Sequence, residues 1–129
     1  MTGMPTVAVV EDNADNRLLL QALLGDRYRL VEFDNGADAL AGFARSLPDL
    51  VLLDISLPGM DGNEILSRIR SDDRLRTLPV IALTAHAMAG DREKYLSAGF
   101  DDYVTKPIVD ENELIRAIDR GIGAGRQAG

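Results

Sequence analysis

Cysteine is absent from the 129-residue sequence, and histidine occurs once, at His86. Without cysteine the chain can form no disulfide, no thiolate zinc site and no thiol nucleophile, and one histidine cannot build a histidine-rich metal site. No apolar run approaches the roughly 20 residues of a membrane span, and the N-terminus lacks the basic and apolar segments of a signal peptide. We therefore expect a cytoplasmic protein with no membrane partner.

Positive charge is also scarce: 14 Lys and Arg stand against 21 Asp and Glu, a net charge of −7. This balance repels nucleic acids as well as anionic membranes, so we expect no nucleic-acid partner. The hydrophobic share of 46% and the charged share of 27% are typical of globular domains. A chain of this length predicts a single domain that buries its core without disulfides.

Five short apolar runs alternate with segments of helical spacing. The first, third and fourth runs are nearly continuous in Val, Ile, Leu and Ala, which is typical of strands that helices cover on both faces. Five such βα units predict an α/β fold with a parallel sheet, helices on both faces and right-handed crossovers. We expect the strands at residues 6–10, 28–33, 50–54, 79–84 and 102–104.

Most of the predicted helices have an apolar face that should pack on the sheet. Asn13 should cap the first helix, expected at 14–25, and Asp110 should cap the fifth. The expected faces hold Leu18, Leu19, Ala22 and Leu23 in the first helix, Ala37, Leu40, Ala41 and Ala44 in the second, Ile65, Leu66 and Ile69 in the third, and Leu114, Ile115 and Ile118 in the fifth.

Glycine marks the expected helix ends. Gly25, Gly99 and Gly121 lie where three of the helices should stop. The segment after Gly121 is rich in glycine and has no apolar face. We therefore expect one domain over residues 1–120 and a short flexible tail over 121–129.

Polar side chains follow four of the predicted strands. Glu11 and Asp12 come after the first, Asp54 ends the third, Thr84 ends the fourth and Lys106 follows the fifth. Because ligands of open parallel sheets bind beyond the carboxyl ends of the strands, the fold should bring these residues to one functional edge. That edge then holds three carboxylates, a hydroxyl and an ammonium.

Three carboxylates in one place need a proton or a cation. Two of them about 4 Å apart repel by roughly 4 kcal/mol at an effective dielectric constant near 20. Oxygen ligands without histidine or cysteine select Mg²⁺, Mn²⁺ or Ca²⁺, and a site with few protein ligands favours Mg²⁺. A carboxylate beside Mg²⁺ can attack phosphorus to form an aspartyl phosphate, and Lys106 and Thr84 suit the phosphoryl oxygens.

Four motifs, in order and at strand ends, carry a resemblance to a known family. They are VVEDN at 9–13, LLDISLPGMDG at 52–62, ALTAHA at 82–87 and DDYVTKPI at 101–108. From residue 5 to about residue 120, the chain resembles the receiver domain of two-component response regulators. The resemblance implies a doubly wound, flavodoxin-like sheet of five parallel strands in the order 2-1-3-4-5.

The resemblance also implies roles for the residues at this edge. Asp54 is the expected phosphoacceptor. Glu11, Asp12, Asp54 and the backbone carbonyl of Ser56 are the expected ligands of Mg²⁺, with Mn²⁺ as a substitute. Lys106 should pair with the phosphoryl group.

Further residues belong to the switch that the resemblance implies. Thr84 should hydrogen-bond the phosphoryl group, and Tyr103 should turn inward when Thr84 moves toward it. Ser56 and His86 flank the phosphoryl site, where they should tune the lifetime of the acyl phosphate. The Lys106–Pro107 peptide bond is expected to be cis.

A receiver takes a phosphoryl group from a phosphohistidine, here on a sensor histidine kinase or a histidine phosphotransfer protein. It then contacts a downstream protein whose identity the sequence does not indicate. The chain would catalyse its own phosphorylation and dephosphorylation, as a signalling switch and not as a turnover enzyme. We expect a single-domain regulator without a DNA-binding output, as a monomer or a weak phosphorylation-dependent dimer.

Other interpretations stay open. The chain could be a receiver cut from a hybrid histidine kinase, or a pseudo-receiver that binds partners without phosphorylation. A phosphatase of the haloacid-dehalogenase type also uses an Asp nucleophile, but its second Asp falls on Ser56 and the chain is too short for a cap domain. A flavodoxin-like nucleotide binder needs glycine or hydroxyl groups where Glu11 and Asp12 stand.

Overall fold

The computed structural model describes residues 4–57, 59–85, 91–106 and 110–128. Within these ranges, five strands alternate with five helices. The strands are β1 (Thr6–Val10), β2 (Arg29–Phe33), β3 (Leu50–Asp54), β4 (Val80–Thr84) and β5 (Asp102–Thr105). The helices are α1 (Ala14–Leu24), α2 (Gly36–Arg45), α3 (Gly62–Ser71), α4 (Asp91–Ala98) and α5 (Glu111–Ala128).

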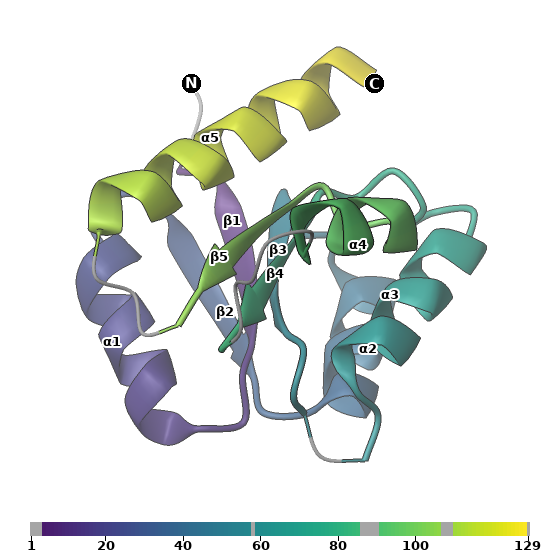
Figure 1. Cartoon of the computed structure of the whole chain (residues 1–129), viewed down its shortest axis with the longest axis horizontal. Helices are drawn as coiled ribbons and strands as arrows, with labels where there is room; N and C mark the ends of the chain where they lie inside the picture. Colours follow the sequence, from purple (N-terminus) through teal and green to yellow (C-terminus); the bar gives the residue numbers. More distant parts are fainter. Residues whose placement is uncertain (1–3, 58, 86–90, 107–109, 129) are drawn as a thin grey trace.

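The five strands form one parallel sheet in the order β2-β1-β3-β4-β5. This confirms the predicted α/β fold and its strand order. The register pairs Val10 with Leu53 and Asp54 with Leu83, so the carboxyl ends of the central strands lie side by side. These ends form the lower edge of the sheet in Figure 1.

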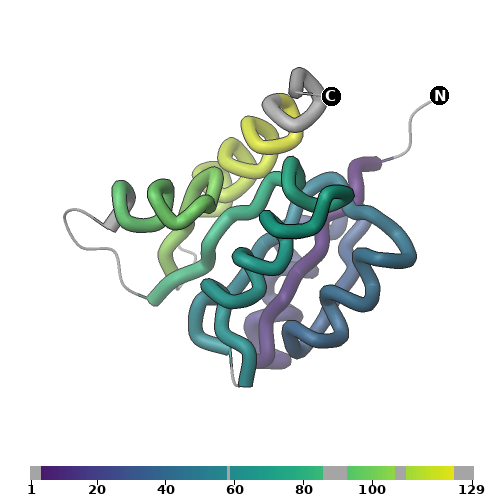
Figure 2. The backbone as a smooth tube through the Cα atoms, turned by 90° about the vertical axis from the view of Figure 1, so that its right-hand side faces the viewer, coloured from purple at the N-terminus to yellow at the C-terminus, as the bar shows by residue number. Residues whose placement is uncertain are grey.

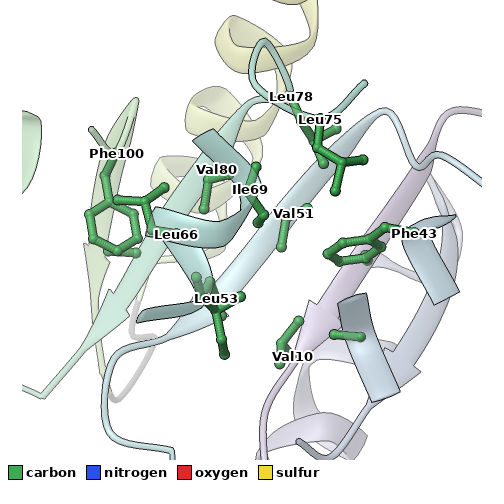
Figure 3. Close-up of a cluster of buried hydrophobic side chains, with 14 of the residues drawn as sticks. Val10, Phe43, Val51, Leu53, Leu66, Ile69, Leu75, Leu78, Val80 and Phe100 are labelled. Atoms are coloured by element: carbon green, nitrogen blue, oxygen red, sulfur yellow. The ribbon is translucent and has the colours of Figure 1, made fainter. Parts of the chain in front are cut away.

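Helices cover both faces of the sheet. Successive residues of a strand point to opposite faces, so each strand packs against helices on both sides. Val7 and Val9 of β1 pack with α1 and α5, whereas Ala8 and Val10 pack with α2, α3 and α4. Figure 2 shows α4, α3 and α2 across one face. Figure 3 shows the core that they cover, which includes Phe43 of α2, Leu66 of α3 and Leu53 of β3. This two-sided burial explains the continuous apolar runs of β3 and β4.

The faces of α3 and α5 and both caps are as predicted. Ile65, Leu66 and Ile69 of α3 are buried, and so are Leu114, Ile115 and Ile118 of α5. Asn13 caps α1 by accepting hydrogen bonds from the amides of Asp15 and Asn16. Asp110 accepts from the amides of Asn112 and Glu113 at the start of α5.

The predicted face of α1 is wrong. Leu18 is 70% exposed, whereas Leu20 is 2% exposed and Leu24 is fully buried. Five leucines lie within seven positions of this helix, so more than one apolar stripe is available. Docking against the sheet selects the stripe of Leu20 and Leu24, a choice that periodicity alone cannot make.

The predicted face of α2 is also wrong. Ala37, Ala41 and Ala44 are exposed and Leu40 is only partly buried. The buried residues are Gly36, Ala39 and Phe43. The Phe43 ring removes far more apolar area from water than an alanine methyl does, and it meets the ring of Phe33 edge-on at 5.7 Å.

Helix α5 was predicted to end at Gly121, but it continues to Ala128. The glycine serves close packing instead, since a Cβ at this position would lie 2.6 Å from Cδ1 of Leu50. Ile122, one residue further, is buried in the same cluster. The flexibility expected of residues 121–129 stays a prediction. In the part of the chain that the structure describes, no helix has both the length and the apolar character needed to cross a membrane.

The two leucine stripes of α1 can be told apart by mutation. Leu20→Ala should lower the free energy of unfolding by about 2–4 kcal/mol, because it removes a buried side chain and leaves a cavity. Leu18→Ala, the matched control, should change it by less than about 0.5 kcal/mol, because that side chain lies in solvent. Urea unfolding of both variants measures the difference, and equal losses would contradict the observed face.

Candidate functional site

The acidic residues predicted from the strand ends come together at the carboxyl edge of the sheet. Carboxylate oxygens of Glu11, Asp12 and Asp54 all lie within 4.8 Å of one another. Glu11 and Asp54 are buried, whereas Asp12 is exposed. The cluster is therefore anchored in the protein interior and open to solvent on one side.

The loop after β1 holds Glu11 by several hydrogen bonds. Its Oε2 accepts from the amide of Asn13 at 3.1 Å, the residue that also caps α1. Its own amide donates to the carbonyl of Phe33 at 3.0 Å. Arg17 donates from Nη1 to the carbonyl of Glu11 at 2.8 Å. The buried carboxylate is thus fixed in direction before any ligand arrives.

Asp54 ends the central strand β3, and its surroundings are equally constrained. Its Oδ1 accepts from the amide of Ser56 at 2.9 Å, and the Ile55 amide donates to the carbonyl of Leu83 at 3.1 Å. Helix α3 begins directly behind, at Gly62, where a Cβ would lie 2.7 Å from the carbonyl oxygen of Asp54. Only glycine permits the chain to return this close to the acidic residue.

Lys106 places an ammonium between two of the carboxylates. Its Nζ donates to Oδ2 of Asp54 at 3.0 Å and to Oε1 of Glu11 at 3.2 Å. Burial alone would lower the pKa of Lys106, but the hydrogen bonds and charges of Asp54 and Glu11 raise it above its ordinary value. Lys106 therefore stays charged at neutral pH.

The single ammonium does not neutralise the cluster. Burial raises the pKa of Glu11, and the nearby charge of Asp54 raises it further, against the hydrogen bonds from Asn13 and Lys106. Three carboxylates against one ammonium leave two excess negative charges. An all-oxygen donor set with this charge and one solvent-exposed member fits a hard divalent cation such as Mg²⁺.

Thr84 lies at this edge of the sheet, and Tyr103 lies further back on β5. Thr84 is buried and follows Leu83, the register partner of Asp54. Its carbonyl accepts from the amide of Lys106 at 2.7 Å, and its hydroxyl lies 2.9 Å from that of Tyr95 on α4. The half-buried Tyr103 stacks at a tilt on Tyr95, with ring centroids 5.6 Å apart.

Of the remaining predicted site residues, the structure describes Ser56 but not His86 or Pro107. Ser56 is exposed, and its amide bonds Asp54, while the metal-binding role of its carbonyl stays a prediction. His86, Pro107 and the Lys106–Pro107 peptide bond lie outside the described residues. Tyr95 was not predicted from the sequence, in which its signal is one aromatic residue within a polar helix.

Comparisons with known proteins give matches over most of the chain. The family model of the response regulator receiver domain matches residues 7–119. An uncharacterized 14.6 kDa protein of Leptolyngbya boryana is 44% identical over 115 residues, covering 88% of this chain and 87% of the relative. The polar-differentiation response regulator DivK of Brucella anthropi is 41% identical over 104 residues, covering 80% of this chain and 85% of DivK.

Larger proteins contain a similar segment. Sensor histidine kinase GacS of Pseudomonas protegens is 42% identical over 123 residues, which are 92% of this chain but 13% of GacS. Among solved structures, the receiver domain of sensor histidine kinase PA1611 from Pseudomonas aeruginosa superposes with a TM-score of 0.84 at 38% identity. It covers 94% of this chain and 99% of that one, and carries a magnesium ion coordinated in its active-site cleft.

Removing the buried charge of Glu11 should stabilise the fold. We expect Glu11→Gln to raise the melting temperature at pH 7 by about 2–5 °C, because burial and Asp54 make the ionised carboxylate unfavourable. The exposed Glu113→Gln should leave it nearly unchanged. Thermal unfolding in EDTA measures both, and a lower melting temperature for Glu11→Gln would contradict the assignment.

The gain should depend on pH. A carboxyl whose pKa is raised by folding holds its proton more tightly in the folded state, so ionising it costs stability only as pH rises through the raised pKa. The advantage of Glu11→Gln over wild type should therefore vanish below the ordinary Glu pKa of 4.5 and grow toward pH 7. An advantage that is constant over this range would contradict the burial of a charged Glu11.

Proposed function

The chain belongs to the response regulator receiver domain family of two-component signalling, and we propose that Asp54 is its phosphoryl acceptor. The observation that carries the proposal is the buried Asp54 carboxylate, which Lys106 contacts at 3.0 Å beside Glu11 and Asp12. This arrangement supplies a nucleophile, a cation for the phosphoryl oxygens and two further metal ligands.

Asp54 fits the role of nucleophile better than its neighbours do. Burial raises the pKa of Glu11, which makes its ionised, nucleophilic form less favourable. Asp12 is exposed, so water competes for it. The orientation of Asp54 is set at both oxygens, by the Ser56 amide and by Lys106. Positioning of this kind is most of what a protein contributes to phosphoryl transfer.

The proposed reaction moves one phosphoryl group between two side chains. An Asp54 oxygen attacks the phosphorus of a phosphohistidine, the P–N bond to the donor imidazole breaks, and an acyl phosphate forms on Asp54. Lys106 balances the charge of the transferred group and Thr84 donates a hydrogen bond to it. Glu11, Asp12, Asp54 and the Ser56 carbonyl would hold Mg²⁺, or Mn²⁺ in its place, which when bound neutralises phosphoryl charge.

Phosphorylation then shifts a two-state equilibrium. The acyl phosphate carries about two negative charges where the ionised Asp54 carboxylate carries one, and its oxygens draw Lys106 and Thr84 toward it. Tyr103 turns inward after Thr84, and the surface of α4, β5 and α5 changes with it. The proposed donor is a sensor histidine kinase or a histidine phosphotransfer protein in the cytoplasm, and the proposed output is contact with a downstream protein.

A second proposed setting for this domain is within a longer sensor kinase. The match to GacS covers 92% of this chain but only 13% of the kinase, so the same domain also occurs inside a much longer sensor protein. In that setting we propose the same chemistry at Asp54, with the phosphoryl group passed on within a relay. Either context uses the site in the same way.

The acceptor can be tested with a small phosphodonor. Incubation with acetyl phosphate and Mg²⁺ should add about 80 Da, one phosphoryl group, to the intact chain. Asp54→Asn should abolish the gain because it removes the nucleophile, and EDTA should abolish it in wild type. Asp73→Asn, at an exposed turn, is the control that should label normally.

Undiminished labelling of Asp54→Asn would contradict the acceptor assignment. A wild-type chain that takes up no phosphoryl group from acetyl phosphate or from a phosphohistidine donor would support the pseudo-receiver interpretation instead.

Mg²⁺ should bind the folded chain without any phosphodonor. At tenfold excess over its dissociation constant it should stabilise the fold by about 1.4 kcal/mol. Asp12→Asn should lose this response, yet the metal-free stability should not fall, because the substitution removes an exposed charge that repels Glu11 and Asp54. Thermal unfolding across a Mg²⁺ titration measures both, and an equal response in wild type and Asp12→Asn would exclude Asp12 as a ligand.

A further inference from the structure

Tyr95 is a buried residue of α4 that the proposed chemistry does not use. Its side chain is 6% exposed. The ring packs edge-on against Phe100 at 6.0 Å and at a tilt against Tyr103 at 5.6 Å. These contacts fix the direction of its hydroxyl, which lies 2.9 Å from Oγ1 of Thr84.

Thr84 thus lies between α4 and the acidic cluster. Its backbone is held by the pairing of β4 with β5 and by the amide of Lys106, which donates to its carbonyl. Movement of its hydroxyl therefore requires rotation of the side chain, and threonine has few χ1 rotamers. The hydrogen bond to Tyr95 favours the rotamer in which Oγ1 points toward α4.

We propose that Tyr95 is a positioning residue that holds the Thr84 hydroxyl toward α4 and so opposes its contact with a phosphoryl group on Asp54. The inference rests on the proposed function of Asp54. When Thr84 leaves, the phenolic hydroxyl loses this partner in an interior lined by Phe100 and Tyr103. An unsatisfied buried hydroxyl is unfavourable, so the bond shifts the equilibrium toward the unphosphorylated state.

The same contact links the site to the surface. Because Tyr95 packs on Tyr103, breaking its bond to Thr84 loosens α4 at the point where Tyr103 has to move. Release of Thr84 and rearrangement of α4 are then one event. The resting position of the switch is set by a residue outside the acidic cluster.

Tyr95→Phe separates the hydroxyl from the ring. It keeps the packing against Phe100 and Tyr103 and removes only the bond to Thr84. We expect it to raise the affinity for the beryllium trifluoride anion, a phosphoryl mimic, about fivefold in the presence of Mg²⁺, the effect of one ordinary hydrogen bond. Isothermal titration calorimetry of the whole chain measures the affinity.

Two comparisons show whether the effect runs through Thr84. Tyr28→Phe removes the hydroxyl of another buried tyrosine, a residue that is 4% exposed and donates to Asp119 at 2.6 Å. It should change the affinity less than twofold. In a Thr84→Val background, Tyr95→Phe should have no further effect, because its partner is already absent. A merely structural role of Tyr95 would alter thermal unfolding without this pattern.

Other results would contradict either the role of Tyr95 or the proposed function of Asp54. Unchanged or weaker binding by Tyr95→Phe overturns the inference, and so does a fivefold gain that persists in the Thr84→Val background. A wild-type chain that binds no beryllium trifluoride and forms no acyl phosphate overturns the proposed function itself. Normal wild-type phosphorylation with equal affinities of wild type and Tyr95→Phe overturns only the role of Tyr95.

Discussion

The ammonium of Lys106 between Asp54 and Glu11 is the interaction on which the rest of the site depends. It joins β5 to β3 and β1 through residues 52 and 95 positions apart in the chain. Without a cation, two buried carboxylates this close together would repel each other strongly or take up protons. The parallel sheet makes the contact available, because it brings the carboxyl ends of all three strands to one edge.

The charge that remains gives the site its function. Lys106 offsets only part of the negative charge, and the raised pKa of Glu11 shows that burial of its ionised form is unfavourable. The amides of Asn13 and Ser56 and the close approach of Gly62 hold Glu11 and Asp54 in place despite this repulsion. A fold that keeps such groups together is organised for a divalent cation and a phosphoryl group, and it is least stable without them.

Much of this was predictable from sequence, for a simple reason. Buried parallel strands have clear apolar runs in the sequence, and the residues at their carboxyl ends lie at one edge of the sheet. Glu11, Asp54 and Lys106 could therefore be predicted to lie together. The buried faces of α1 and α2 could not be predicted. In α1, adjacent leucines offer two apolar stripes, and in α2, Phe43 buries more apolar area than several alanines do. Tyr95 could not be predicted as a site residue either, because its hydrogen bond to Thr84 depends on how α4 docks and its neighbours in sequence are polar.

Locating the phosphoryl group on the chain shows whether Asp54 carries it. The acyl phosphate formed with Mg²⁺ and a phosphodonor can be reduced with borohydride, which converts the modified aspartate to homoserine, and the digested chain can be sequenced by mass spectrometry. We expect the conversion at Asp54 alone. Conversion at Asp12, or at another aspartate with Asp54 unchanged, would contradict the account.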